Sequence, residues 1–285
     1  MTGLLLMATM LSAQCGTSVD TTFRIPEGTR IEFVDQDLNL DIRARPAHSA
    51  SATAAGTLPE GACLELSVAG GVHTLRIRRI EDRTRTRAEI ILEVPAATPV
   101  KVRITNGSVR ISGLHGGVSV TTVYAPIAAR NLRGEILLRA VEADVTADSL
   151  EGTVYLRSTA KDVHANSIGG DLTIESVGGR MRVTGAMPRT ITSSTWGGVI
   201  DVEGLPPAGG RFQLATHSGD VRIVLPKSGN AVFEVTTWEA QVRSTVPLSQ
   251  ALKKGEPRRG VFGAGGALVE ISSVQGRIVI TSRVE

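Results

Sequence analysis

Aromatic residues are scarce in this sequence, and neither sign of charge predominates. Aromatic side chains make up 3% of the 285 residues, which leaves few rings on which the bases of single-stranded nucleic acid stack. The 31 basic and 28 acidic residues give a net charge of +3, too small to indicate a nucleic-acid partner. We therefore expect no nucleic acid among the partners of this chain.

Cysteine is almost absent, and histidine forms no cluster. Cys15 and Cys63 are too few for a disulfide framework or a zinc site with four cysteine ligands, although one bridge between them stays open. The five histidines show no short metal-ligand spacing. We expect no metal and no cofactor.

Long apolar runs are also missing, except at the N-terminus. The stretch "MTGLLLMATMLSA" is shorter than the roughly 20 residues that a membrane-crossing helix needs, and it predicts a signal peptide over residues 1–19. The mature chain would then be exported to the periplasm or cell surface without a transmembrane helix. Two alternatives are a lipid anchor on Cys15 and an apolar N-terminal strand.

What the chain does have is a repeat. Its 41% hydrophobic content is mostly aliphatic and stands beside 31 glycines, a composition typical of an all-β protein. Glycines recur at 116, 134, 152 and 170, and apolar residues recur with them in five rungs of 18 residues that begin at 100, 118, 136, 154 and 172. Positions 1, 3, 10, 12 and 15 of every rung are apolar, where composition alone would make about fifteen of these 25 positions polar.

The spacing within a rung predicts its structure. Apolar residues two apart indicate strands with one buried face, and each rung holds two such strands. Like residues in register predict parallel pairing with the next rung, which makes a single-stranded right-handed parallel β-solenoid with more irregular strands at both ends. The glycine of each rung is expected at a corner with positive φ. Alanines at position 12, such as Ala129 and Ala147, predict a thin interior without a ligand cavity.

Outside the regular rungs the pattern loosens. We expect an N-terminal β region or cap over residues 20–99, with a flexible loop at 46–61, and regular rungs over 100–189. Residues 190–285 should form further rungs with a long loop at 245–266. Turns at "SGD" (218–220) and "VQG" (274–276) predict hairpins.

Three segments carry a resemblance to a known family: "VPAATPVKVRITNGSVRISGLHGGVSV" at 94–120, "HSGDVRIVLP" at 217–226 and "SSVQGRIVI" at 272–280. With the repeated "L-x-G" corners, they resemble the bacterial putative-adhesin family of β-strand-repeat envelope proteins over residues 30–285. The resemblance implies the fold and an envelope location. It implies no catalytic residue and no cofactor.

One column of carboxylates invites an enzymatic interpretation. Asp144 and Asp162 occupy the same position of successive rungs, and Asp171 begins the next. Such a set is able to bind Ca²⁺ or to act as general acid and base on a sugar. Because Arg180 follows in the same column, a solvated charge ladder is the favoured interpretation, and we assign no catalytic residue.

Two features are candidate interaction surfaces. The first is an apolar patch around Leu137 and Tyr155, which face outward in neighbouring rungs, with Trp196 and Trp238 farther along. The second is a set of basic residues suited to anionic glycan or lipid, in a hairpin and in the C-terminal loop: Arg76, Arg78, Arg83, Arg85, Arg87, Lys253, Lys254, Arg258 and Arg259. A charged edge that prevents aggregation is the favoured explanation of the basic residues.

These observations favour a non-enzymatic exported envelope protein, an adhesin or interaction scaffold whose flat faces contact an envelope protein or a glycan. One alternative is a structural scaffold that self-associates end to end. Uncovered terminal strands would favour that alternative, whereas a capped N-terminal region would oppose it. The other alternative is a carbohydrate-active enzyme that uses Asp144 and Asp162.

Overall fold

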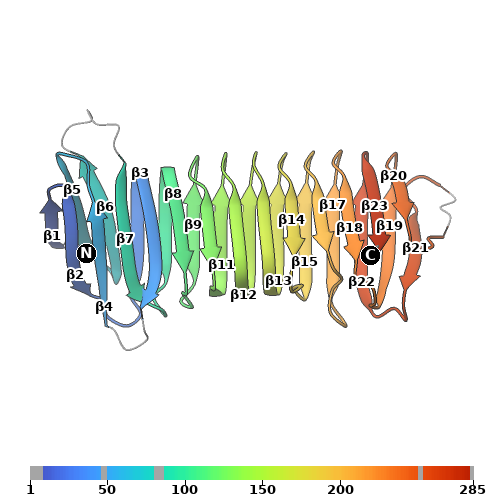
Figure 1. The fold of residues 1–285 in the computed structure, drawn as a ribbon, viewed down its shortest axis with the longest axis horizontal. Helices are drawn as coiled ribbons and strands as arrows, with labels where there is room; N and C mark the ends of the chain where they lie inside the picture. The colour runs from blue at the N-terminus through green and yellow to red at the C-terminus, as the bar shows by residue number, and fades with distance from the viewer. Residues whose placement is uncertain (1–8, 46–49, 80–86, 250–252, 283–285) are drawn as a thin grey trace, which may run out of the picture. The chain divides into compact units, whose positions relative to one another are not determined.

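The protein is all-β. The structure is a computed structural model that describes residues 9–45, 50–79, 87–249 and 253–282, and within these residues it contains strands and no helix. Consequently no helix of the described chain has the length and apolar character to cross a membrane. The chain divides into two compact units, Met1–Leu138 and Arg139–Glu285 (Figure 1).

The first unit is organised around one long strand that pairs in parallel on both sides. Its strands are β1 (Thr9–Cys15), β2 (Ser18–Arg24), β3 (Arg30–Arg45), β4 (Ser51–Thr57), β5 (Ala62–Ala69), β6 (Val72–Arg79), β7 (Ala88–Pro95), β8 (Val100–Ser112), β9 (Val118–Thr122), β10 (Ile127–Arg130) and most of β11 (Arg133–Ala140). One edge of β3 pairs with β8, and the other pairs with β6 and then β7. Strands β9 and β10 pair in parallel with β8.

The N-terminal part of this unit contains four antiparallel strand pairs, and its role as a cap stays a prediction. Strand β4 pairs with β2 and β7, and β5 pairs with β1 and β6. The predicted loop at 46–61 is wrong for residues 51–57, because these small residues form β4 between two partners; residues 46–49 lie outside the described chain. Small side chains suit this strand because Ala52 and Ala54 are fully buried.

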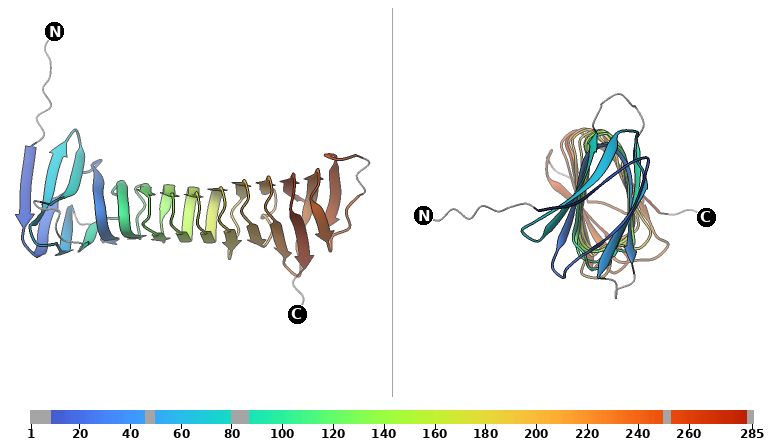
Figure 2. Two further views of the ribbon diagram at one scale, coloured as in Figure 1. Left: turned by 90° about the horizontal axis from the view of Figure 1, so that it is seen from above. Right: turned by 90° about the vertical axis from the view of Figure 1, so that its left-hand side faces the viewer.

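The regular rungs begin in the first unit, at residues 100 and 118, and continue through the second. The strands of the second unit after β11 are β12 (Val145–Ser158), β13 (Val163–Ser176), β14 (Met181–Thr184), β15 (Thr190–Thr195), β16 (Ile200–Glu203), β17 (Arg211–Thr216), β18 (Val221–Leu225), β19 (Ala231–Thr237), β20 (Gln241–Ser244), β21 (Pro257–Phe262), β22 (Ala267–Ser273) and β23 (Arg277–Ser282). Strands β12 and β13 pair in parallel from Val145↔Val163 to Ser158↔Ser176, the 18-residue register that the repeat predicts. The turns of this unit superpose in the end-on view (Figure 2).

The predicted interior positions are buried in both units, with one exception. Every residue at positions 1, 3, 10, 12 and 15 of the five rungs has at most 3% of its surface exposed, apart from Ala186. Ala186 is exposed, so its assignment to the core is wrong. The reason is a change of register: Leu172 pairs with Ile191, one residue more than the 18-residue period.

Three of the four corner glycines adopt the backbone conformation that the sequence predicts. Gly134, Gly152 and Gly170 have positive φ, and a Cβ on Gly170 would lie 2.3 Å from the carbonyl oxygen of Gly152; at Gly116 the prediction is wrong, because its neighbour Gly117 has the positive φ instead. A second corner also has positive φ, at Asn131, Ser149 and Ser167, which are 18 residues apart. Only small or locally hydrogen-bonding residues tolerate this conformation readily, which explains their recurrence.

Buried hydroxyls hold the turns between the two strands of each rung. Each of four turns has a hydroxyl that accepts a hydrogen bond from the backbone N–H three residues later, at distances of 2.9–3.2 Å; the four residues are Ser158, Ser176, Thr195 and Thr216. Because these turns carry otherwise unpaired N–H groups, the hydroxyl satisfies a donor that water cannot reach.

The C-terminal rungs are not stacked in chain order. Strands β22 and β23 lie between β17 and β18 on one side and β19 and β20 on the other, all in parallel pairs. The hairpins predicted at "SGD" and "VQG" are therefore wrong: strands joined by these turns pair with neighbouring rungs and not with each other. The loop predicted at 245–266 is wrong for residues 257–262, which form β21 antiparallel to β19.

Cys15 and Cys63 form a disulfide. A sulfur atom in a disulfide carries no lipid thioether, so the structure does not support the anchor predicted at Cys15. Residues 9–15 form β1, and residues 18 and 19 begin β2. The signal peptide over residues 1–19 stays a prediction, and its removal would take away β1 and one half of the disulfide.

Candidate functional site

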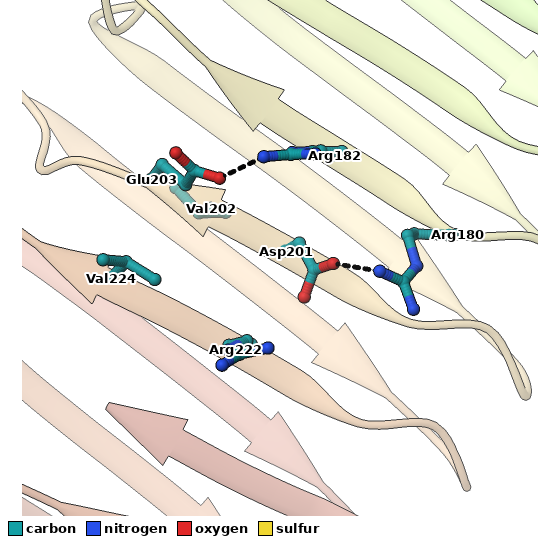
Figure 3. A pocket seen from close by; sticks show the side chains of 7 residues that line it. All are labelled: Arg180, Arg182, Asp201, Val202, Glu203, Arg222 and Val224. Carbon is teal, nitrogen blue, oxygen red and sulfur yellow. Dashed lines mark hydrogen bonds and ion pairs between the residues drawn. The ribbon is translucent and has the colours of Figure 1, made fainter. Parts of the chain in front are cut away.

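Ion pairs run from strand to strand over the outer face of the second unit. Arg180, the residue before β14, pairs with Asp201 of β16 at 3.1 Å, and Arg182 of β14 pairs with Glu203 of β16. These four side chains, with Arg222, Val202 and Val224, line an open pocket of about 380 Å³ (Figure 3). The pocket arises because outward positions of successive rungs face each other at the strand spacing of about 4.8 Å.

Arg222 differs from the other two arginines of this pocket. It lies on β18 beside Asp201 in register, it is exposed, and it has no ion-pair partner in the part of the chain that the structure describes. Figure 3 shows its guanidinium apart from the two dashed ion pairs. Three arginines and two carboxylates leave a net charge of +1. The pocket therefore retains one positive charge for a ligand.

The carboxylate column is built into the backbone ladder. Asp144 accepts a hydrogen bond from the N–H of Asp162 at 3.1 Å, and Asp162 accepts one from the N–H of Arg180 at 2.9 Å. Asp171 accepts a hydrogen bond from the Thr190 hydroxyl at 2.7 Å. These contacts fit the predicted structural ladder, because each carboxylate satisfies a donor of the next rung. The described residues contain no cluster of three potential metal ligands.

The basic residues predicted in one hairpin lie on separate strands. Arg76 and Arg78 are exposed on β6, which pairs with β5 and not with β7, so the hairpin is wrong. Arg78 forms an ion pair with Glu65, and Arg87 is exposed just before β7. Arg83 and Arg85 lie outside the described residues. The cationic function of this set stays a prediction.

The basic residues of the C-terminal region are partly engaged with the protein itself. Arg259 pairs with Glu234 at 2.7 Å, and Arg258 donates to the carbonyl oxygen of Ser249 at 3.1 Å. Lys254 lies 3.9 Å from Glu239, and Lys253 is exposed. These contacts anchor the chain around β21.

The two residues of the predicted apolar patch belong to different units. Leu137 is half-buried in the first unit. Tyr155 in the second unit donates its hydroxyl to Glu175 at 2.6 Å, and its ring lies 5.0 Å below the Arg139 guanidinium. Burial, followed by the hydrogen bond to Glu175, raises the pKa of Tyr155. Tyr155 is thus a member of a polar network, and an apolar patch shared with Leu137 stays a prediction.

Sequence reasoning missed a column of residues at the turns of the second unit. The residue that follows the last inward-facing position of each rung's first strand is exposed or half-buried. In spatial order these residues, which we call the turn column, are Val141, Thr159, Val177, Trp196, His217, Val274 and Trp238, of which Thr159, His217 and Val274 are half-buried. Trp196 is 64% exposed and Trp238 is 48% exposed. Both tryptophans of the protein therefore stand in one column, a fact hidden in the sequence because β22 is inserted before β19.

Trp196 and His217 form a stacked pair within the turn column. Their ring centroids are 4.2 Å apart and the planes differ by 13°. The backbone fixes both residues: Ser218 N–H donates to Trp196 O at 2.8 Å, and Gly197 N–H donates to Val177 O at 2.9 Å. Trp196 directly follows Thr195, the last buried residue of β15. This position, one residue after a buried strand face ends, is the feature of the sequence that identifies the turn column.

Comparison with known proteins adds little. No family model and no curated protein matches the chain. A "putative adhesin" from Bacteroides fragilis has a TM-score of 0.47 at 13% identity, over 93% of this chain and 97% of its own. A "putative cell adhesion protein" from Clostridium sporogenes has a TM-score of 0.26 at 11% identity, over 93% and 100%. Likenesses of this size carry no argument about function.

Proposed function

We propose that this protein is a non-enzymatic, exported binding scaffold, whose parallel strands form a right-handed β-solenoid and present ordered faces to an envelope protein or a glycan. The observation that carries the proposal is the strict register of β12 and β13, in which thirteen residue pairs follow the 18-residue period. Such a register repeats every outward position at about 4.8 Å, so that weak contacts to an extended partner are multiplied.

The disulfide supports export of a chain that retains Cys15, which is at odds with a signal peptide that is removed as far as residue 19. Cys15 and Cys63 are joined, and disulfides persist in oxidising compartments such as the periplasm or the cell surface. The test is fractionation of cells that express the tagged full-length chain, followed by thiol labelling of the recovered protein. An oxidised, exported chain is expected, and a reduced cytosolic chain would overturn this part of the proposal.

The contacts of the carboxylate column support a role without catalysis. Asp144 and Asp162 each accept a hydrogen bond from a backbone N–H of the next rung, which makes them acceptors in a structural ladder. The purified protein should release no reducing ends from a panel of polysaccharides. Release that disappears in the double variant Asp144→Asn, Asp162→Asn would establish the carbohydrate-active alternative instead.

The terminal strands oppose the self-assembling alternative. Strand β21 lies antiparallel along β19, and the N-terminal cap pairs its strands antiparallel, so neither offers the parallel rung edge on which an identical copy would continue the ladder. Sedimentation at several concentrations should show one species. Filaments that grow with concentration would favour the structural scaffold.

A further inference from the structure

The stacked rings and the arginine pocket share two rungs of the second unit, and the pocket extends to a third rung through Arg180 and Arg182. Strands β15 and β17 pair Thr195 with Thr216, so the turns that begin with Trp196 and His217 are adjacent. Five residues after each ring, Asp201 and Arg222 pair in register on β16 and β18. Five residues of extended chain span at most about 17 Å, so one extended ligand reaches both features.

The ring pair has the form of a binding platform. His217 covers one face of Trp196, and on the other side the next residue of the turn column is the shorter Val177. The 64% exposure of Trp196 leaves most of its surface to solvent. An aromatic ring carries negative charge on its face, which attracts the polarised C–H groups of a sugar ring, and a ring already held in place loses little entropy on binding.

The pocket supplies charge complementarity. Its net charge of +1 arises because the carboxylates of Asp201 and Glu203 pair with two of the three arginines and leave Arg222. A guanidinium binds a carboxylate through two parallel hydrogen bonds. One uncompensated charge matches a carboxylate monoanion, while the neighbouring carboxylates accept hydrogen bonds from hydroxyls and repel a ligand of higher charge.

We propose that Trp196, His217 and Arg222 bind a polysaccharide whose sugar rings carry carboxylates, with a ring stacked on Trp196 and a carboxylate on Arg222. This inference rests on the proposed function as a binding scaffold and names the chemical class of its partner. It is independent of the basic residues around β6 and β21, which lie on other strands.

The test measures binding of the purified full-length protein to polygalacturonate, alginate and hyaluronate, and to the methyl ester of polygalacturonate as an uncharged match. Trp196→Ala should weaken binding of the acid about tenfold, as loss of a central aromatic contact does. Arg222→Gln should remove the preference for the acid over its ester. Two matched controls should change binding less than about threefold: Trp238→Ala, in the same turn column, and Arg243→Gln, exposed on β20.

Several outcomes overturn the inference: binding to none of the three acids, equal binding of acid and ester, or equal losses in the variants and their controls. A parallel assay separates this failure from failure of the proposed function. If the labelled protein binds envelope fractions that have been stripped of polysaccharide, the proposed binding scaffold is supported with a protein partner. If it binds neither intact nor stripped envelope fractions, the proposed function is refuted.

Discussion

Gly170 offers the sharpest test of the packing between rungs. A Cβ at this position would lie 2.3 Å from the Gly152 carbonyl oxygen, about 0.7 Å closer than the 3.0 Å below which real Cβ contacts essentially do not occur. Its φ of +89° lies where an L-residue is strained by about 1–2 kcal/mol. Pushing the two packed strands apart adds about 1–3 kcal/mol to this destabilisation. The lower conformational entropy of the unfolded chain with alanine offsets about 0.4–1 kcal/mol of it. Gly170→Ala should therefore lower the free energy of unfolding by about 3 kcal/mol.

Gly178 is the matched control. It is also an exposed glycine of the second unit, yet a Cβ there meets no atom within 4 Å and its φ is not in the strained range. Gly178→Ala should leave stability unchanged or raise it by up to about 1 kcal/mol. Urea denaturation followed by tryptophan fluorescence suits the comparison, because Trp196 and Trp238 both belong to this unit. Equal stability of the two variants would refute the close approach of the two corners.

Three further predictions concern single contacts. Cys63→Ser should lower the free energy of unfolding by about 4 kcal/mol, the value that the loop-entropy relation gives for a separation of 48 residues. Reduction of the native chain with dithiothreitol should shift the urea midpoint by the same amount. No shift would mean that the disulfide is absent from the purified chain. Ser176→Ala should lower the free energy of unfolding by about 1–2 kcal/mol, because the N–H of Gly179 loses its buried acceptor. In the control Ser194→Ala, where the serine is exposed, calorimetry should show no measurable change in stability. Burial lowers the pKa of His73 from 6.5, so between the folded and unfolded pKa values the unfolded chain binds more protons than the folded chain. The contribution of neutral His73 to the free energy of unfolding is therefore complete above about pH 6.5 and is lost as the pH falls through the folded pKa. His73→Leu should flatten this dependence in denaturation curves at pH 7.5 and 5, and an unchanged slope would assign it to other groups.

The positions that the sequence predicted well are those decided within one rung. Val145, Ala147 and Leu150 are buried because strand alternation and an 18-residue period leave them no other side to face. Ala186 fails because one additional residue before Ile191 shifts the register, which composition does not reveal. The small-residue run at 51–57 resembles a loop, and it forms a strand only because β2 and β7 provide partners on both sides.

The candidate site shows the same division. The ladder around Asp144 and Asp162 follows from their common column, and the sequence predicted it as a structural feature. The turn column was not predictable as a surface, because its members are separated by irregular intervals of 19 to 57 residues after Val177 and do not follow chain order. Trp196 and Trp238 fall in one column only when β22 is placed between β17 and β19.

In the regular rungs, alternation and spacing along a continuous chain were enough to predict the strands, their buried faces and the rung period. The order in which the C-terminal rungs stack depends instead on contacts between distant segments. Strands β19 and β22 have the same alternation and equally apolar inner faces, so either is able to pair with β17 by its local pattern. The choice of β22 rests on pairing across the whole C-terminal region, with β19 bonded to both β22 and β21, and it brings Trp196, His217 and Trp238 into the turn column.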